Sequence, residues 1–174
     1  MSSCENADAA WLRRAIDLSA DNLDGEKGGP FGAVIVQDGQ LIGEGANRVL
    51  ADHDPTAHAE MVAIRAASAA LGQDHLGGAV LYTSCEPCPM CLAAAYWAGI
   101  GRIVWANSRL DAESIGFGDA LIYQEIGKPA AARQIAGQQL LAEEGRAVFA
   151  RWQERNPGLT YGPKVAPDQA GPGD

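Results

Sequence analysis

Residues 85–91 read CEPCPMC and residues 58–60 read HAE, and together these two stretches form the pattern of a metal site. A catalytic zinc ion takes three imidazole or thiolate ligands and keeps a fourth position open for water. His58, Cys88 and Cys91 supply three such ligands and leave the coordination incomplete. The pattern therefore predicts one catalytic Zn²⁺ per chain.

An acidic side chain accompanies the predicted ligands. Glu60 lies two residues after His58, where its reach is too short for it to be a fourth ligand as well. A carboxylate beside a zinc-bound water can take a proton from that water and pass it on. We therefore expect Glu60 to be the catalytic acid and base.

Two other kinds of metal site could use the same residues. Cys85 could complete a structural zinc site of three cysteines and His58, with no catalysis. Alternatively, Cys85, Cys88 and Cys91 could hold an iron–sulfur cluster, since their spacing is that of ferredoxin-type runs. No nearby fourth cysteine completes a cluster, and neither site gives Glu60 a task. Cys85 fits better as a small buried apolar residue.

The composition is that of an ordinary globular protein. The chain has 174 residues, of which 47% are hydrophobic and 20% are charged, and this length fits one domain. The longest apolar run, residues 91–104, is interrupted by Arg102 and too short to span a bilayer. The first residues lack the features of a signal peptide, and clustered cysteines are typical of metal binding in a reducing compartment. We expect a cytoplasmic protein with no membrane partner.

The net charge of −9 bears on the substrate. Proteins that bind nucleic acids neutralise the phosphates with Lys and Arg side chains. An acidic chain is therefore a poor match for a polyanion. A small neutral base is the expected substrate, with no nucleic-acid partner.

Hydrophobic periodicity and turn residues divide the chain into alternating strands and helices. Helices are predicted at residues 8–22, 54–71, 88–98 and 143–155, and strands at residues 33–37, 40–44, 79–83, 102–106 and 138–141. Asp38-Gly39, between the first two strands, is typical of a tight hairpin, so the sheet begins antiparallel. The alternation indicates a layered α/β fold.

The predicted ligands fall at the starts of two helices. Asp54 and Pro55 supply an N-cap and a first-turn proline, which places His58 in the first turns of its helix. Cys88 and Cys91 begin the next helix, and their spacing of three residues lets both sulfurs reach one ion. Both helices direct their positive ends at the ion, which favours thiolate over thiol.

The pairing of H-x-E with P-C-x-x-C is the signature of zinc-dependent nucleobase deaminases, and the resemblance extends beyond it. The chain resembles the bacterial guanine deaminase branch of the cytidine deaminase-like superfamily over about residues 8–161. The matching stretches are GPFGAVIV at residues 29–36, DPTAHAE at 54–60, YTSCEPCPM at 82–90, and Gly116-Phe117 with Asp119. This resemblance implies a three-layer α/β/α fold with a central mixed five-stranded sheet.

The resemblance also implies roles for residues outside the zinc motif. Phe31 would stack on a purine, although an aromatic residue before a strand is also common in a core. Asn47 would hydrogen-bond the edge of the base, or serve only as a turn residue. Asp119 would bind guanine and assist proton transfer, but its neighbour Gly118 stands where the family has aspartate. Tyr161 matches a tyrosine that caps the active site of the partner subunit.

These features predict a homodimeric hydrolase that deaminates guanine to xanthine and ammonia. Residues 1–156 would form the deaminase domain. Residues 157–174 would form a tail that is swapped onto the partner up to about residue 164 and is disordered beyond it. Rival substrates within the superfamily are guanosine, cytosine, adenosine in tRNA and aminotriazines. A rival of another class is a non-catalytic interaction module stabilised by zinc.

Overall fold

The computed structural model describes residues 3–160 and 162–163, and the chain divides into two compact units. The first unit holds the residues up to Asp119, together with Pro163, and the second runs from Ala120 to Gly162. No helix in the described part of the chain is both long and apolar enough to cross a bilayer.

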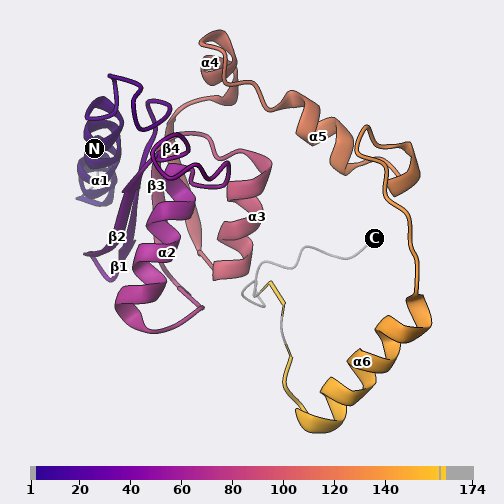
Figure 1. Ribbon diagram of the computed structural model, residues 1–174. Coiled ribbons are helices and arrows are strands. Elements are labelled where there is room, and N and C mark those ends of the chain that lie inside the picture. Colours follow the sequence, from indigo (N-terminus) through magenta and orange to yellow (C-terminus); the bar gives the residue numbers. More distant parts are fainter. Residues whose placement is uncertain (1–2, 161, 164–174) are drawn as a thin grey trace. The chain divides into compact units, whose positions relative to one another are not determined.

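A mixed four-stranded sheet forms the centre of the first unit, in the order β2-β1-β3-β4 (Figure 1). Its strands are β1 Gly32–Gln37, β2 Gln40–Ala46, β3 Val80–Cys85 and β4 Arg102–Asn107. β1 pairs antiparallel with both β2 and β3, whereas β3 and β4 run parallel. The β1–β2 connection turns at Asp38 and Gly39, both with positive φ, as the Asp-Gly pair predicts.

Helices cover both faces of this sheet, so the unit has three layers (Figure 1). α1 Ser3–Ala20 covers one face, and α2 Ala59–Leu71 and α3 Pro89–Ala98 cover the other. Side chains alternate along a strand. Val34 and Val36 of β1 therefore pack with α1, and Ala33 and Ile35 pack with α2. The predicted mixed sheet between helical layers is confirmed.

Small residues let α2 lie close to β2. Ala63 and Ala67 of α2 are fully buried, and a Cβ added to Gly43 of β2 would lie only 2.6 Å from the carbonyl oxygen of Ala63. Larger side chains here would push the helix away from the sheet, because the interior is closely packed. The small residues thus help to hold the start of α2, where His58 lies.

Both helices that carry predicted ligands end where the predicted ranges end, and a glycine follows each of them. Gly72 after α2 and Gly99 after α3 have φ values of 64° and 71°. This left-handed conformation is one that glycine adopts without the steric cost of a Cβ. Each backbone N–H then bonds a carbonyl of the last helical turn. These ends fix the lengths of the two helices.

The start of α2 differs from the prediction. Asp54 and Pro55 precede the helix rather than cap it, and His58 is the N-cap residue. The carboxylate of Asp54 accepts hydrogen bonds from both the backbone N–H and the hydroxyl of Thr56. Asp54 therefore forms an Asx turn with Thr56 instead of an N-cap, and the helix begins at Ala59.

A short helix, α4 Arg109–Ser114, follows β4 and leads to the loop that carries Asp119. Ser108 and Asp111 form a capping box at its start, in which each side chain bonds the other residue's backbone N–H. The box fixes where the chain leaves the sheet.

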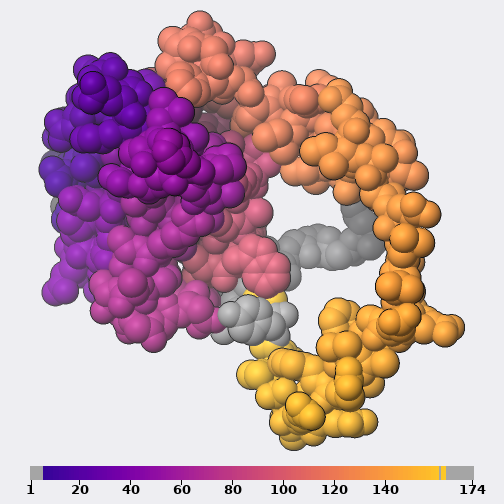
Figure 2. All heavy atoms as spheres, viewed as in Figure 1, coloured from indigo at the N-terminus to yellow at the C-terminus, as the bar shows by residue number. Residues whose placement is uncertain are grey.

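The second unit contains α5 Ala120–Ile126, a 3-10 turn at Ala130–Ala132 and α6 Ala142–Arg155. The predicted helix at 143–155 is therefore confirmed. The predicted strand at 138–141 is wrong, because these residues form no strand, and Leu140 and Leu141 are 73% and 71% exposed. Figure 2 shows the chain before α6 as a thin connecting segment. The sheet of the described residues accordingly has four strands rather than the expected five.

Candidate metal centre

The three predicted ligands lie at the starts of α2 and α3. His58 is the N-cap of α2 and Cys88 is the N-cap of α3, both with extended backbone, and neither side chain caps its helix by a hydrogen bond. Cys91 lies in the first turn of α3 and is fully buried. The ligands therefore stand at the positive ends of two helices, where anionic sulfur is stabilised.

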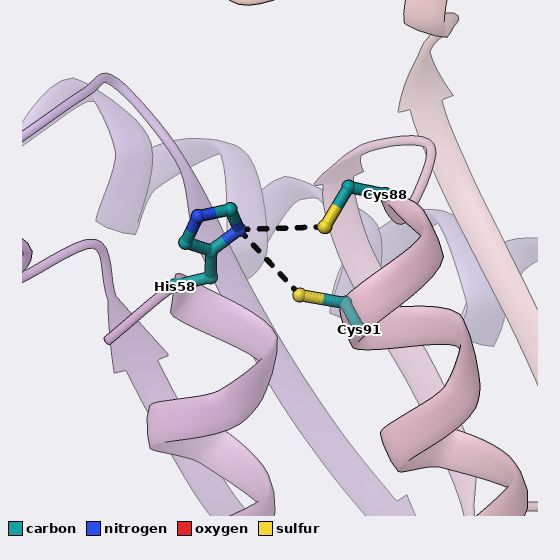
Figure 3. A group of neighbouring side chains, drawn as sticks. All are labelled: His58, Cys88 and Cys91. Carbon is teal, nitrogen blue, oxygen red and sulfur yellow. Dashed lines mark hydrogen bonds between the residues drawn. The ribbon is translucent and has the colours of Figure 1, made fainter. Parts of the chain in front are cut away.

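The distances within this group fit a zinc ion. The Nδ1 atom of His58 lies 3.6 Å from the sulfur of Cys88 and 3.6 Å from the sulfur of Cys91 (Figure 3). With Zn–N of about 2.0–2.1 Å and Zn–S of about 2.3 Å, tetrahedral geometry separates nitrogen and sulfur by about 3.6 Å. Among the described residues, this is the only group of three metal-binding side chains with ligand atoms within 4.8 Å of one another. The donor set and spacing thus match a three-ligand zinc site.

In the absence of a metal ion, the thiol groups of Cys88 and Cys91 differ in pKa. A hydrogen bond from Cys91, with a further one from His58, lowers the pKa of Cys88 to about 4 despite burial. The same bond to Cys88, together with burial, raises the pKa of Cys91. A bound zinc ion deprotonates a coordinating thiol outright. Metal binding therefore requires Cys91 to release its proton.

Glu60 lies beside the ligands without belonging to their group. It is in the first turn of α2, is only 6% exposed, and lies within hydrogen-bonding range of the Cys91 side chain. Burial raises the pKa of its carboxyl group above the usual value. A carboxylate beside the ligands with a raised pKa has the properties of a general acid and base.

Cys85 stands apart from the ligands. Its sulfur donates a hydrogen bond to the carbonyl oxygen of Ser108 at 3.6 Å, and the side chain is 7% exposed. Burial raises the pKa of its thiol to about 11. Cys85 is not among the side chains whose ligand atoms lie within 4.8 Å of one another, and this position disfavours both a structural site with four protein ligands and an iron–sulfur cluster.

Phe31 and Asn47 adjoin each other where β1 begins and β2 ends. Phe31 is half-buried and packs against the core beneath α2. The backbone N–H of Asn47 donates to the carbonyl of Phe31 at 3.0 Å. The Asn47 side chain is buried, and its Oδ1 atom accepts a hydrogen bond from the N–H of Val49. The turn-residue interpretation of Asn47 and the base-binding one are thus compatible.

The carboxyl group of Asp119 is partly buried and is influenced by the charge of Cys88. Burial, followed by the negative sulfur of Cys88, raises the pKa of its carboxyl group. The structure therefore brings Asp119 towards the ligands, although they are separated by β4 and α4 in the sequence. Tyr161 lies outside the described residues.

Comparison with known families agrees with this geometry. Residues 5–107 match the cytidine and deoxycytidylate deaminase zinc-binding region. The chain belongs to this deaminase family. It is a zinc-dependent hydrolase of the cytidine deaminase-like fold, with His58, Cys88 and Cys91 placed to hold one Zn²⁺.

Relatives within the deaminase family differ in how much of the chain they match. Guanine deaminase of Bacillus subtilis is 48% identical over 143 residues, which cover 82% of this chain and 92% of that enzyme. The X-ray structure of guanine deaminase from Bacillus subtilis superposes with a TM-score of 0.84 at 44% identity, covering 92% of this chain and 99% of that chain. The tRNA-specific adenosine deaminase of Agrobacterium fabrum is 50% identical over only 76 residues, 44% of this chain and 50% of that enzyme.

One residue that supports the loops of Phe31 and Asn47 had no signal in the sequence. Asn22 is 1% exposed, and its Nδ2 atom donates to the carbonyl of Gly29 at 2.7 Å and to the carbonyl of Asn47 at 3.0 Å. It thereby clamps the two loops that carry Phe31 and Asn47. A lone asparagine after a helix reads as a solvated turn residue, so only the fold could reveal this role.

Proposed function

We propose that this deaminase hydrolyses guanine to xanthine and ammonia. The observation that carries the proposal is the His58, Cys88 and Cys91 group beside buried Glu60, in a chain that is 48% identical to Bacillus subtilis guanine deaminase over 92% of that enzyme. The TM-score of 0.84 with the structure of guanine deaminase, against 0.56 with that of a tRNA:A34 deaminase, and the net charge of −9 favour a free purine over tRNA.

The chemistry divides between the metal and Glu60. When bound at the three ligands, Zn²⁺ supplies a Lewis acid that lowers the pKa of water from 15.7 in bulk to about 7. Glu60 takes one proton from the attacking water and delivers it to the ring nitrogen, and it then carries the second proton, from the hydroxyl of the adduct, to the leaving amine. A C–O bond forms, the C–N bond breaks, and ammonia leaves. Glu60 is buried beside the ligands, where its carboxyl group can hold a proton between the two transfers.

Three further residues orient the base in this proposal. Phe31 offers a half-buried ring for stacking. Asn47 has its Oδ1 atom engaged by Val49, which directs its NH₂ group as a donor to the edge of the base. Asp119 places a carboxylate opposite the N–H edge of guanine and assists proton transfer. Its raised pKa, due to burial and Cys88, supports a place beside the reacting atoms.

The active form in this proposal is a homodimer in which the tail is exchanged. Residues 1–156 form the deaminase domain, and residues 157–174 form the tail, with Tyr161 capping the partner's site. Support comes from uncovered apolar side chains on both units: Tyr96, Trp97, Trp105, Val148, Phe149 and Trp152, each at least 43% exposed. Exposed Tyr, Trp and Phe side chains are enriched at protein interfaces. A second copy of the chain is the occupant that we propose.

A cytoplasmic location completes the proposal. Cys85, Cys88 and Cys91 are all free thiols in the described part of the chain. Thiols that bind zinc must stay reduced, and the cytoplasm keeps them so.

A substrate panel tests the proposed function. Zinc-loaded protein would be given guanine, guanosine, cytosine, an aminotriazine and a tRNA containing the target adenosine, and ammonia release would be measured. We expect guanine to be deaminated with the highest kcat/KM, and Glu60→Gln protein to be the matched inactive control. A higher kcat/KM with another substrate would reassign the reaction. If no substrate releases ammonia, a non-catalytic zinc module would be favoured.

A further inference from the structure

Two aromatic rings of the first unit meet edge to face. The ring centroids of Phe31 and Phe117 lie 5.0 Å apart, with an angle of 88° between the ring planes. This arrangement is attractive because the positive edge of one ring faces the negative face of the other. Phe117 belongs to the loop after α4 that ends in Asp119, and its side chain is 46% exposed. The contact therefore joins two loops that carry proposed substrate contacts.

Gly29 provides the space for this pair. A Cβ added to Gly29 would lie 2.7 Å from Cε2 of Phe31 and 2.9 Å from Cε1 of Phe117. Both distances are shorter than van der Waals contact allows, so one of the rings would have to move. Gly29 does not have positive φ. The position therefore requires the absence of a side chain rather than the conformational freedom of glycine.

The main chain of Phe31 is held independently of its ring. Its N–H donates to the carbonyl of Gly29 at 2.9 Å, and its carbonyl accepts from the N–H of Asn47 at 3.0 Å. Buried Asn22 bonds the carbonyl groups of both neighbours. These bonds fix the backbone, and packing against the core restricts the side chain of Phe31 on one side. The ring of Phe117 adds a directional contact to this packing and favours one rotamer of the Phe31 ring.

We propose that Phe117 is a positioning residue that acts through Phe31. It holds the Phe31 ring in the orientation that stacks on the purine, and Gly29 leaves room for that orientation. The inference rests on the proposed function, in which Phe31 contacts the base. Because Phe117 acts through another side chain, its removal should matter only while the Phe31 ring is present.

A double-mutant cycle tests this dependence. Phe117→Leu, Phe31→Leu and the double variant would be prepared with zinc, and kcat and KM would be measured for guanine. Leucine keeps an apolar side chain but removes the ring edge. We expect Phe117→Leu to lower kcat/KM about two- to tenfold in the wild-type background, mainly through a higher KM. In the Phe31→Leu background, the same change should cause no further loss.

Two other variants separate positioning from a general effect on the fold. Phe117→Tyr keeps the ring edge, and its added hydroxyl can reach water because the side chain is exposed. Its kcat/KM should therefore stay within about twofold of the wild type. Ile115→Ala removes a 59% exposed side chain from the same loop, and it should match the wild type in kinetics. Zinc content and Tm of every variant would show that each is folded and loaded.

The outcomes distinguish this inference from the proposed function. If the losses of the two single variants multiply in the double variant, or if Phe117→Leu has wild-type kinetics, the positioning role is wrong. If the wild-type protein does not deaminate guanine, the proposed function is wrong instead. The cycle would then be measured with whichever base of the panel is turned over, and the same pattern of non-additivity would be required.

Discussion

At the scale of single residues, the three cysteines of residues 85–91 should respond differently to the same substitution. The sulfurs of Cys88 and Cys91 lie 3.6 Å from Nδ1 of His58, whereas Cys85 bonds the carbonyl of Ser108. We expect Cys88→Ser and Cys91→Ser to lose zinc, because only three protein ligands hold it. Cys85→Ser should retain one zinc per chain, measured by elemental analysis. Loss of zinc from the Cys85 variant would overturn the ligand assignment.

Glu60 should separate metal binding from turnover. It lies outside the ligand group yet within range of Cys91. Glu60→Gln keeps the size of the side chain but cannot carry a proton, so turnover should fall at least about a hundredfold. Zinc content and Tm should stay close to those of the wild type. Near-normal ammonia release by a zinc-loaded Glu60→Gln protein would rule out the assigned proton transfers.

Asp119 should affect guanine turnover but not the metal. In the proposed complex its carboxylate accepts a charge-assisted hydrogen bond from the base, worth about 1.5–3 kcal/mol. Asp119→Ala should therefore lower kcat/KM for guanine about ten- to a hundredfold and leave zinc content unchanged. Wild-type kcat/KM in this variant would show that Asp119 is only a loop residue.

At the scale of elements, the attachment of α1 to the sheet should depend on pH. Asp8 accepts two hydrogen bonds from Arg102 of β4 and one from the hydroxyl of Tyr82 of β3. These bonds, Arg102 first, lower the pKa of Asp8 from 3.8 to about 2. Since the pair is partly exposed, we expect Asp8→Asn to lower the free energy of unfolding by about 1–2 kcal/mol at neutral pH.

The pH range of this effect follows from the sign of the shift. A carboxyl group whose pKa is lowered on folding stabilises the protein above its unfolded pKa, and that stability disappears as the pH falls through the folded value. The difference in urea stability between the wild type and Asp8→Asn should therefore shrink as the pH falls from 3.8 towards 2. Asp17→Asn, an exposed change on the same helix, should show no such difference. A difference that is independent of pH would exclude the ion pair as its cause.

The elements that were predicted correctly are those whose structure depends on a few residues that are neighbours in the sequence. The hairpin at Asp38-Gly39 and the stops at Gly72 and Gly99 each depend on one or two residues whose backbone preference is strong. The zinc group was predictable for a similar reason, because its residues sit at helix starts with fixed spacing. Local chemistry at these positions agrees with the fold.

The incorrect predictions concern contacts between distant segments. Residues 138–141 have the apolar character of a strand, but a strand exists only where a neighbour offers hydrogen bonds, and no described residue pairs with them. Asp54 is a residue type that often caps helices, but its carboxylate accepts hydrogen bonds from Thr56 instead of from a helical N–H group. The clamp of Asn22 and the contact of Phe117 with Phe31 join segments that no spacing in the sequence connects.

At the scale of the whole molecule, the second unit cannot be stable by itself. No residue of α5 or α6 is buried, and Phe149 and Trp152 are 73% and 43% exposed. A helix with its apolar side chains in water gains little from packing. We therefore expect this unit to obtain its packing in the proposed homodimer, and gel filtration with light scattering should then give twice the mass of the 18.2 kDa chain.

The tail gives the sharpest test of the dimer, because an intact tail and an intact catalytic site can be placed on two different chains. Truncation after Asn156 should lower guanine turnover with little loss of zinc, since it removes Tyr161 and admits water to the site. Truncation after Lys164 is the matched control and should leave turnover unchanged. A Glu60→Gln chain with an intact tail would then be co-expressed with the chain truncated after Asn156. If the tail crosses between subunits, the mixed dimer recovers activity, because the intact tail caps the site that retains Glu60. No recovery in a verified mixed dimer would mean that the tail does not cap the partner's site.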